Sequence, residues 1–330
     1  MVIKNIRPAI SSVCNMNCKY CSNIKGQNAR MEDFRRSPLS EGVLSTEQWL
    51  KMFKSFYDAG FRGISLTGGE PMLNPDWLKM LKYCKEIGYL STELTSNLLA
   101  LSKYKSELKK VDYISKFKVS LDTFDKERFY YLTGVDGLNT VLDNVKYCVD
   151  LGFNVQLNRV TMRSTQNELV DYIKKANELG VNVNLLDLVF YKGSNSDNNV
   201  VKWANEYVPP EFTWLFLKQN INDFGELESD PRYGLRTSYG KTKIILKDSQ
   251  LTKRSKKCER CPLYCQEGIF TVRIASDGTI TTCPDYKNEL PYIDGVAALN
   301  NQTLTSKLEK VFKDFSIQEE NHFLEYVRRL

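Results

Sequence analysis

The chain has 330 residues, 42% of them hydrophobic, and a formal net charge of +6, enough apolar material for one large domain or for a large and a small one. No apolar run approaches the length of a membrane span, and the N-terminus lacks the apolar stretch of a signal peptide, so a soluble, cytoplasmic protein is expected. The mild, dispersed charge does not indicate nucleic-acid binding. Because His322 is the single histidine, chemistry built on a histidine base or on several histidine ligands is not expected.

Strands and helices alternate over the first 190 residues. Short apolar strands bounded by turn residues are expected at 7–13, 62–67, 89–95, 115–121, 153–160 and 182–189. Helices are expected between them, at 46–59, 75–87, 101–110, 138–151 and 165–179. This alternation predicts a parallel sheet with right-handed crossovers, and roughly six βα units are too few to close a full eight-stranded barrel. The predicted fold class is therefore α/β, with an open, partial (β/α)6 barrel similar to a TIM barrel.

The pattern changes after Tyr191. The polar stretch KGSNSDNNV indicates a loop or linker, and a helix is expected at 211–223. Short β-type runs follow at Lys243–Leu246, Phe270–Ile274 and Thr279–Thr282, with Ser276-Asp277-Gly278 as a turn between the last two; the tail at 304–330 reads as an amphipathic helix. The expected division is a barrel at 1–190, a linker and helix at 191–230, and a small subdomain of β-hairpins with a C-terminal helix at 231–330.

Three cysteines are crowded into the stretch CNMNCKYC, directly after the first expected strand. Their spacing is Cys14-x3-Cys18-x2-Cys21, and the carboxyl ends of parallel strands are where active sites of such folds are built. In a reducing cytosol, clustered cysteines favour a metal site or catalysis over disulfides. Structural zinc and an ordinary [4Fe–4S] cluster use four protein ligands. Three thiolates on a four-iron cluster would leave one iron free to bind another ligand.

That spacing, in that place, resembles the radical S-adenosylmethionine (SAM) superfamily, and a second motif supports the resemblance. Thr67-Gly68-Gly69-Glu70-Pro71 follows the second expected strand and is similar to the family's GGE motif, which contacts the amino group of SAM's methionine part. Two glycines let the backbone approach a ligand closely, and a carboxylate suits an ammonium group. The resemblance implies a [4Fe–4S] cluster on Cys14, Cys18 and Cys21, and SAM binding by Gly68, Gly69 and Glu70.

Polar residues also follow the third, fourth and fifth expected strands. They stand in the stretches Thr95-Ser96-Asn97, Val119-Ser120-Leu121-Asp122 and Leu157-Asn158-Arg159. In the radical SAM family such positions bind the carboxylate and ribose of SAM. By this resemblance we expect Ser96, Ser120 and Asn158 to bind SAM as well.

A second cysteine group lies in the C-terminal third of the chain. Cys258-x2-Cys261-x3-Cys265 is followed, after twelve residues, by Gly278 and, after four more, by Cys283. This pattern resembles the Twitch subdomain, in which a β-turn glycine places the last cysteine opposite the earlier ones. The resemblance implies an auxiliary [4Fe–4S] cluster held by these four cysteines. The spacing alone also permits a four-cysteine zinc site.

Within the superfamily, the barrel half is similar to the GTP 3',8-cyclases of molybdenum cofactor biosynthesis. The stretches SLTGGEP, KVSLDTFDKERFYYLTG and LNRVTMRSTQNEL carry this likeness, which covers about residues 8–190 and, more loosely, 258–283. Three departures stand out. The cyclases' basic residues before TGGEP are replaced by Gly63 and Ser65, the chain ends Val-Arg-Arg-Leu rather than Gly-Gly-Arg, and the second cluster has four cysteines instead of three. We therefore expect the same machinery and a substrate other than GTP.

The resemblance implies an enzyme that cleaves SAM reductively to a 5'-deoxyadenosyl radical, which abstracts a hydrogen atom from a substrate. A small metabolite is the expected substrate, because the chain begins almost at the cluster motif, without an added domain for a leader peptide. Epimerisation or crosslinking of a ribosomal peptide, nucleotide cyclisation of the GTP 3',8-cyclase kind, and a non-enzymatic thiol–zinc or electron-carrying protein stay open. A reducing partner such as flavodoxin or ferredoxin is expected, and no catalytic residue is assigned.

Two further cysteines stand apart from both groups. Cys84 and Cys148 lie at helical spacing among apolar residues. We expect both to be buried thiols that pack as small hydrophobic side chains.

Overall fold

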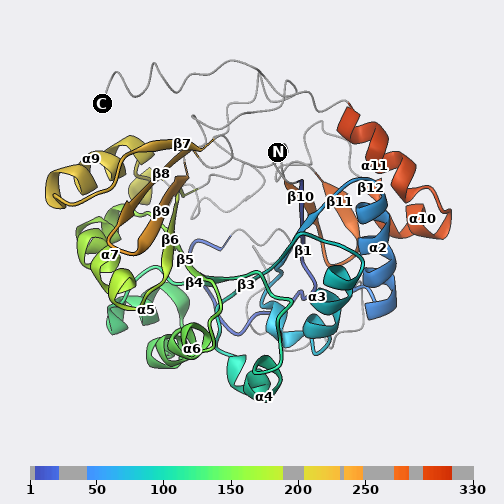
Figure 1. The fold of residues 1–330 in the computed structure, drawn as a ribbon, viewed down its shortest axis with the longest axis horizontal. Coiled ribbons are helices and arrows are strands. Elements are labelled where there is room, and N and C mark those ends of the chain that lie inside the picture. Colours follow the sequence, from blue (N-terminus) through green and yellow to red (C-terminus); the bar gives the residue numbers. More distant parts are fainter. Residues whose placement is uncertain are drawn as a thin grey trace.

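The structure is a computed structural model that describes residues 4–21, 43–188, 204–230, 234–247, 271–281 and 293–313. The described strands form one 12-stranded sheet in the order β12-β11-β10-β1-β2-β3-β4-β5-β6-β9-β8-β7. The sheet curves into an open arc, with helices on its outer side (Figure 1). The predicted α/β partial barrel is confirmed.

The first six strands are consecutive and parallel, as the sequence predicts, and three later strands extend them on each side. The strands are β1 (Asn5–Pro8), β2 (Gly63–Leu66), β3 (Ser91–Ser96), β4 (Lys116–Ser120), β5 (Val155–Val160), β6 (Asn182–Leu186), β7 (Glu228–Asp230), β8 (Gly234–Tyr239), β9 (Thr242–Lys247), β10 (Thr271–Ile274), β11 (Thr279–Thr281) and β12 (Ile293–Asp294). β10 pairs in parallel with β1, and β9 in parallel with β6. The central part of the sheet therefore consists of eight parallel strands.

Helices cover the outer face of this sheet. They are α2 (Thr46–Asp58), α3 (Trp77–Glu86), α4 (Lys105–Leu108), α5 (Lys126–Thr133), α6 (Leu138–Asp150), α7 (Leu169–Glu178), α9 (Pro210–Asn220), α10 (Gly295–Asn300) and α11 (Leu304–Lys313), with 3-10 turns η1 (Pro71–Leu73), η2 (Leu101–Tyr104) and η3 (Arg163–Glu168). α2 begins with a capping box, in which Ser45 and Gln48 each accept from the other's backbone N–H. Its apolar side, which includes Trp49 and Phe53, is fully buried.

Side chains alternate along each strand between the helices and the interior of the arc. In β4, Phe117 and Val119 are fully buried in the hydrophobic core, whereas Lys118 and Ser120 line a central cavity. TIM barrels commonly fill their interior with branched apolar side chains. The polar interior of this arc therefore indicates a binding cavity rather than a packed core.

Several predicted elements are shorter or differently shaped than expected. The first strand covers 5–8 rather than 7–13: beyond it only an isolated bridge joins Ala9 to Thr67, and the chain then forms the cysteine-bearing loop. The segment 101–110 is a 3-10 turn followed by a single helical turn. Helix α5 was not predicted, although Asp125 caps its start and Gly134, at φ 74°, ends it. Strands β7, β8 and β12 were also missed.

The C-terminal predictions are confirmed where the structure describes them. β10 and β11 form the predicted antiparallel hairpin, and Gly278 adopts φ 85° in its turn. Helix α11 begins at Leu304 as expected. Cys258, Cys261, Cys265, Cys283 and His322 lie outside the described residues, so the second cysteine group and the subdomain boundaries stay predictions.

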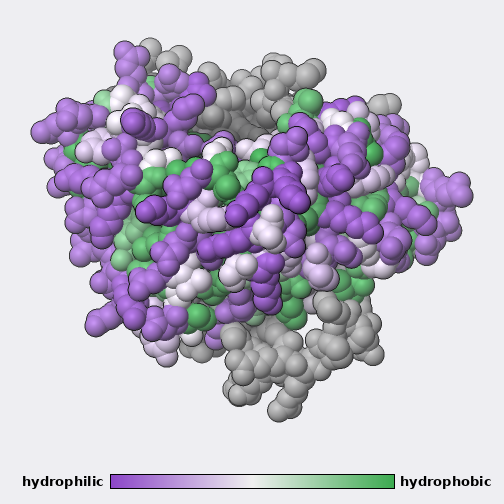
Figure 2. Space-filling view, turned by 60° about the horizontal axis from the view of Figure 1, so that its bottom comes forward, coloured by the Kyte–Doolittle hydropathy of each residue, from purple (hydrophilic) through white to green (hydrophobic). Residues whose placement is uncertain are grey.

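The face of the molecule shown in Figure 2 is mostly hydrophilic. The face shown in Figure 2 carries hydrophobic residues only in small groups among polar ones. Across the described residues, we find no helix that combines the length and the apolar character needed to cross a bilayer.

Candidate active site

A cavity of about 360 Å³ occupies the interior of the arc. Its lining includes every predicted site residue that the structure describes: Cys14, Cys18, Cys21, Gly68, Gly69, Glu70, Ser96, Ser120 and Asn158. They come from the loop after β1 and from the ends of β2, β3, β4 and β5. Because these strands are parallel, their carboxyl ends meet at one side of the sheet and bring the residues together.

The cysteine loop and the TGGE motif are joined by main-chain hydrogen bonds. The N–H of Gly69 donates to the carbonyl oxygen of Ser11 at 2.8 Å, and the N–H of Glu70 donates to that of Val13 at 2.7 Å. These bonds continue the pairing of β1 with β2 beyond the strand ends. The residue before Cys14 is therefore held at a fixed position against the second motif.

Both glycines of the motif are required by this close approach. A Cβ atom on Gly69 would lie 2.1 Å from the carbonyl oxygen of Val13, and one on Gly68 would lie 2.3 Å from that of Ser11. Real Cβ atoms do not approach backbone this closely, so any side chain would push the two loops apart. Gly68 also adopts φ 146°, which disfavours other residues.

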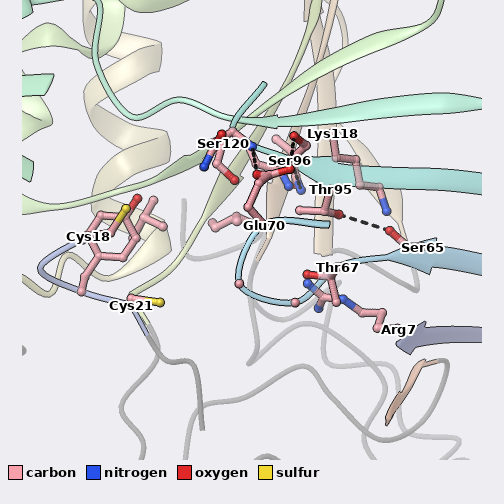
Figure 3. Close-up of a pocket in the computed structure, with 18 of the residues that line it drawn as sticks. Arg7, Cys18, Cys21, Ser65, Thr67, Glu70, Thr95, Ser96, Lys118 and Ser120 are labelled. Carbon is pink, nitrogen blue, oxygen red and sulfur yellow. Dashed lines mark hydrogen bonds between the residues drawn. The ribbon is translucent and has the colours of Figure 1, made fainter. Parts of the chain in front are cut away.

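Glu70 organises the loops around it from a buried position. Its Oε1 accepts from the N–H of Met72 at 3.0 Å and from Ser96 Oγ at 2.7 Å, and its Oε2 accepts from the N–H of Asn97 at 2.8 Å. Burial raises the pKa of this carboxyl group above its ordinary value, while these hydrogen bonds oppose the rise. Glu70 therefore ties the end of β2 to the end of β3, and Figure 3 shows it between the two.

The three thiols lie on one side of the cavity. In Figure 3, Cys18 and Cys21 are on the left, separated from Arg7 and Ser65 by Glu70. Burial raises the pKa of Cys14 to about 11 and raises that of Cys18 further above its ordinary value. Thiolates in such surroundings need a bound cationic centre to be stable.

Asn97 links β3 to the cysteine loop. Its Nδ2 lies 3.9 Å from Cys14 Sγ and donates to Asn15 Oδ1 at 2.7 Å. The side chain is only 5% exposed. Hydrogen bonds to ligand sulfurs influence the properties of thiolate-bound metal centres, so Asn97 is positioned to affect a cluster bound at Cys14. Sequence reasoning did not single it out, although it directly follows Ser96.

Tyr20 anchors the far end of the cysteine loop. Its hydroxyl donates to Asp122 Oδ2, and Asp122 Oδ1 accepts from the N–H of Val160 at 2.8 Å. Burial raises the pKa of Asp122 above its ordinary value. The cysteine loop is thus fastened to β2 at its start, and to β4 and β5 at its end.

Four cationic side chains line the same cavity, and the sequence analysis missed them. They are Arg7 on β1, Lys118 on β4, Lys247 on β9 and Arg273 on β10. Arg7 and Arg273 are direct register partners on neighbouring parallel strands, which stand about 4.8 Å apart. Lys118 is ion-paired with Glu93. The sequence does show that these cations alternate with apolar strand residues. It does not show that β10 pairs with β1.

The cavity therefore has two parts with different chemistry. Thiols and the glycine-rich loop form one side, and cations with amide and hydroxyl groups form the other. Asn5, Ser65, Thr95, Gln156, Asn184 and Thr271 complete the second side. A cofactor bound at the first side would adjoin a second ligand held by the polar, cationic second side.

The family model for the Radical SAM superfamily matches residues 9–176. This is about half of the chain, and it includes the cysteine loop and the TGGE motif. The chain therefore belongs to the radical SAM superfamily.

Curated relatives that the chain resembles carry the name GTP 3',8-cyclase. A probable GTP 3',8-cyclase of Sulfurisphaera tokodaii is 31% identical over 168 residues, which cover 51% of this chain and 50% of the relative. A GTP 3',8-cyclase of Limosilactobacillus fermentum is 27% identical over 292 residues, covering 86% of this chain and 80% of the relative. The chain spans about half the length of the first of these relatives.

Solved structures share the fold at low identity. Streptococcus suis SuiB bound to S-adenosylmethionine has a TM-score of 0.61 at 16% identity, covering 93% of this chain and 66% of SuiB. The enzyme anSMEcpe with bound AdoMet and a peptide has a TM-score of 0.55 at 15% identity, covering 96% of this chain and 84% of that one. These similarities confirm the fold class.

The family's cofactors are a [4Fe–4S] cluster and SAM, and the donor set of this chain fits them. Three thiols line one cavity, while Cys84 and Cys148 are fully buried, as predicted. Across the part of the chain that the structure describes, no three His, Cys, Asp or Glu side chains converge on one metal ion. A four-iron cluster presents a different iron to each cysteine and suits three ligands spread along a loop.

Proposed function

We propose that this chain cleaves SAM reductively and uses the resulting 5'-deoxyadenosyl radical to abstract a hydrogen atom from a small anionic metabolite. A [4Fe–4S] cluster held by Cys14, Cys18 and Cys21 would supply one electron from a reductant such as flavodoxin or ferredoxin, and bound SAM would supply the radical with release of methionine. Transfer of the hydrogen atom then yields 5'-deoxyadenosine and a substrate radical. The observation that carries the proposal is the joining of a three-thiol loop and a cationic interior in one cavity.

The chain's own residues would bind and orient SAM beside the cluster. Gly68 and Gly69 would present their backbone to the methionine part while they let the cysteine loop lie close, and the Glu70 carboxylate would favour the ammonium group of SAM. Ser96, Ser120 and Asn158 line the cavity from the next three strands and would bind the carboxylate and ribose. The network centred on Glu70 would preserve the shape of this site before SAM binds.

The opposite side of the cavity would hold the substrate. Arg7 and Arg273 are register partners that both line the cavity, and an arginine suits a phosphate or carboxylate, which it binds in a bidentate manner. Burial lowers the pKa of Lys118, and its pairing with Glu93 opposes this fall. Because Lys118 is paired in this way, the support for an anionic ligand comes mainly from Arg7, Lys247 and Arg273, which line the same cavity.

Deoxyadenosine formation tests this proposal. Reconstituted chain, kept anaerobic, is given SAM, dithionite and fractions of a metabolite extract separated on an anion-exchange resin. We expect the fraction retained by the resin to increase 5'-deoxyadenosine formation. Stimulation found only in the unretained fraction would contradict an anionic substrate, and no 5'-deoxyadenosine in any sample would contradict SAM cleavage.

A second candidate is GTP 3',8-cyclase activity. The curated relatives carry that name, and Arg7 with Arg273 would suit a triphosphate. Gly63 and Ser65 on β2 supply no cation, however, whereas the cyclases have basic residues there. We therefore expect that the gene does not restore molybdenum cofactor synthesis in a strain lacking the cyclase. Restoration would establish the second candidate instead.

We further propose that Cys258, Cys261, Cys265 and Cys283 together bind an auxiliary [4Fe–4S] cluster with no open iron. A closed cluster would transfer electrons or stabilise the segments around it rather than hold substrate. Each cysteine is replaced by alanine in a background that lacks the first cluster's cysteines, and iron and cluster spectra are measured. Every replacement is expected to alter both, and an unchanged cluster would show that the replaced cysteine is not a ligand.

A further inference from the structure

The cavity wall formed by β4, β5 and β6 carries a chain of hydrogen-bonded amides with a fixed direction. Lys116 Nζ lies 3.4 Å from Gln156 Oε1. A lysine ammonium group can only donate, so this contact determines which end of the Gln156 amide is oxygen. The Nε2 of Gln156 consequently points the other way and donates to Asn158 Oδ1 at 3.2 Å.

The same order of donors and acceptors continues into β6. Asn158 Oδ1 also accepts from Asn184 Nδ2 at 3.1 Å, and Asn158 and Asn184 are register partners on β5 and β6. Since the nitrogen of Asn184 is used in this bond, its oxygen must point elsewhere. Lys116 therefore sets the orientation of Asn184 through two intervening amides.

Two amide oxygens at this cavity lack a donor among the described residues. They are Asn184 Oδ1 and Asn5 Oδ1. The side chains line the cavity and are 5% and 3% exposed. A buried carbonyl without a donor is costly and uncommon in folded proteins. Two of them on the wall of one cavity indicate that a ligand supplies the missing donors.

The surroundings limit the kind of donor. The cavity is lined by the carboxylates Glu70 and Asp187 as well as by Arg7, Lys118, Lys247 and Arg273. The SAM ammonium group would use Glu70, and on the side where the cations gather a neutral donor is favoured over a second ammonium group. A neutral hydroxyl group meets the need of both oxygens without adding charge. Asn5 on β1 and Asn184 on β6 stand on opposite sides of the arc (Figure 1), so one ligand that satisfies both must carry hydroxyl groups at separate positions.

On the basis of the function proposed above, we propose that the substrate is a polyhydroxylated anion of the sugar phosphate class. Its hydroxyl groups donate to Asn184 Oδ1 and Asn5 Oδ1, and its anionic group binds the cations. Lys116 is a positioning residue, because it touches the ligand only through the amides that it orients.

The first test compares two probes that share a phosphate and six carbons. Glucose 6-phosphate and hexyl phosphate are titrated calorimetrically into the anaerobically reconstituted full chain with SAM present. We expect the sugar phosphate to bind at least tenfold more tightly. Asn184→Leu is expected to reduce this preference by about tenfold while leaving the affinity for hexyl phosphate within twofold. Asn220→Leu, at the exposed end of α9, is the matched control and should retain the full preference.

The second test concerns orientation. Lys116→Met removes the donor that fixes the amides, whereas Lys116→Arg retains one. We expect Lys116→Met to lose about tenfold of the sugar preference and Lys116→Arg to keep it. A merely structural role for Lys116 would instead lower the melting temperature of both variants and change the affinity for both probes alike.

The outcomes separate this inference from the proposed function. A wild-type chain that binds the two probes equally, or binds neither, overturns the sugar phosphate class, as does an unchanged preference in Asn184→Leu. Formation of 5'-deoxyadenosine from SAM and dithionite is measured on the same preparation. That reaction tests the proposed SAM chemistry alone, because it does not depend on which probe the chain binds.

Discussion

The backbone N–H of Glu70 donates to the carbonyl oxygen of Val13 at 2.7 Å, and this bond joins the two motifs of the site. Val13 directly precedes the first cysteine, and Glu70 is the acidic residue of the TGGE motif. The relationship uses main-chain atoms alone, so it depends on how closely the two loops approach. The absence of side chains at Gly68 and Gly69 allows that approach.

Replacing Gly69 by alanine should separate the loops. The added Cβ would lie 2.1 Å from Val13 O, which is closer than backbone and side-chain atoms come in proteins. We expect the reconstituted variant to lose most of the iron bound at the first cluster and to melt at a lower temperature. Gly60→Ala is the control, because nothing lies within 4 Å of its Cβ position. Its φ of 90° costs about 1 kcal/mol, but its iron content should be unchanged.

Removing one cluster ligand should abolish SAM cleavage. Cys18→Ala leaves two thiols in the loop, and we expect no 5'-deoxyadenosine from SAM and dithionite. Cys84→Ala removes a thiol that is fully buried on α3 and should cleave SAM at the wild-type rate after correction for folded protein. Equal product from Cys18→Ala would show that this loop does not bind the cluster.

The amide of Asn97 should raise the reduction potential of the first cluster. Its Nδ2 is 3.9 Å from Cys14 Sγ, and a donor near a ligand sulfur stabilises the reduced, more negative cluster. We expect Asn97→Leu to lower the midpoint potential by roughly 20 to 60 mV, equivalent to about 0.5–1.5 kcal/mol for one electron. Potentiometric titration followed by electron paramagnetic resonance measures the shift. A potential equal to that of the wild type would rule out this influence.

The hydrogen bond between Tyr20 and Asp122 should stabilise the fold around the cysteine loop. Tyr20→Phe removes one of the two donors that Asp122 has in this site and leaves a buried carboxylate oxygen unpaired. We expect the free energy of unfolding to fall by about 1–3 kcal/mol in chemical denaturation. Tyr130→Phe changes a tyrosine that is 58% exposed and should alter stability by less than about 0.5 kcal/mol. Equal effects of the two changes would contradict a specific role for the Tyr20 hydroxyl.

Local patterns in the sequence predicted the barrel and one side of the site. Alternating apolar runs located the first six strands, and motif spacing located Cys14, Cys18 and Gly69 at their carboxyl ends. Parallel strands bring such ends together whatever the details of packing. The sequence also contains the residues that cap α5, Asp125 and Gly134. The helix was not predicted because Tyr130 and Tyr131, which are exposed, weaken its apolar periodicity.

The cationic side of the site could not be predicted in the same way. Arg7 and Arg273 lie at opposite ends of the sequence and meet only because β10 pairs in parallel with β1. No local signal specifies which distant strand will pair with which. The sequence motif predicted that Glu70 belongs to the site but not that it joins the end of β2 to the end of β3. Its hydrogen bonds with Met72 and Asn97 depend on how η1 and β3 are placed.

The pairing of β10 with β1 also has a consequence for how the chain avoids aggregation. β1 is short, and its outward neighbour comes from a segment far along the sequence. A truncated chain ending before Thr271 would present the free edge of β1 to other molecules, and exposed strand edges invite intermolecular pairing. During synthesis, β1 stays unpaired on that side until Thr271–Ile274 emerges. The C-terminal hairpin thus covers the edge of the N-terminal strand that would otherwise be open to pairing with other chains.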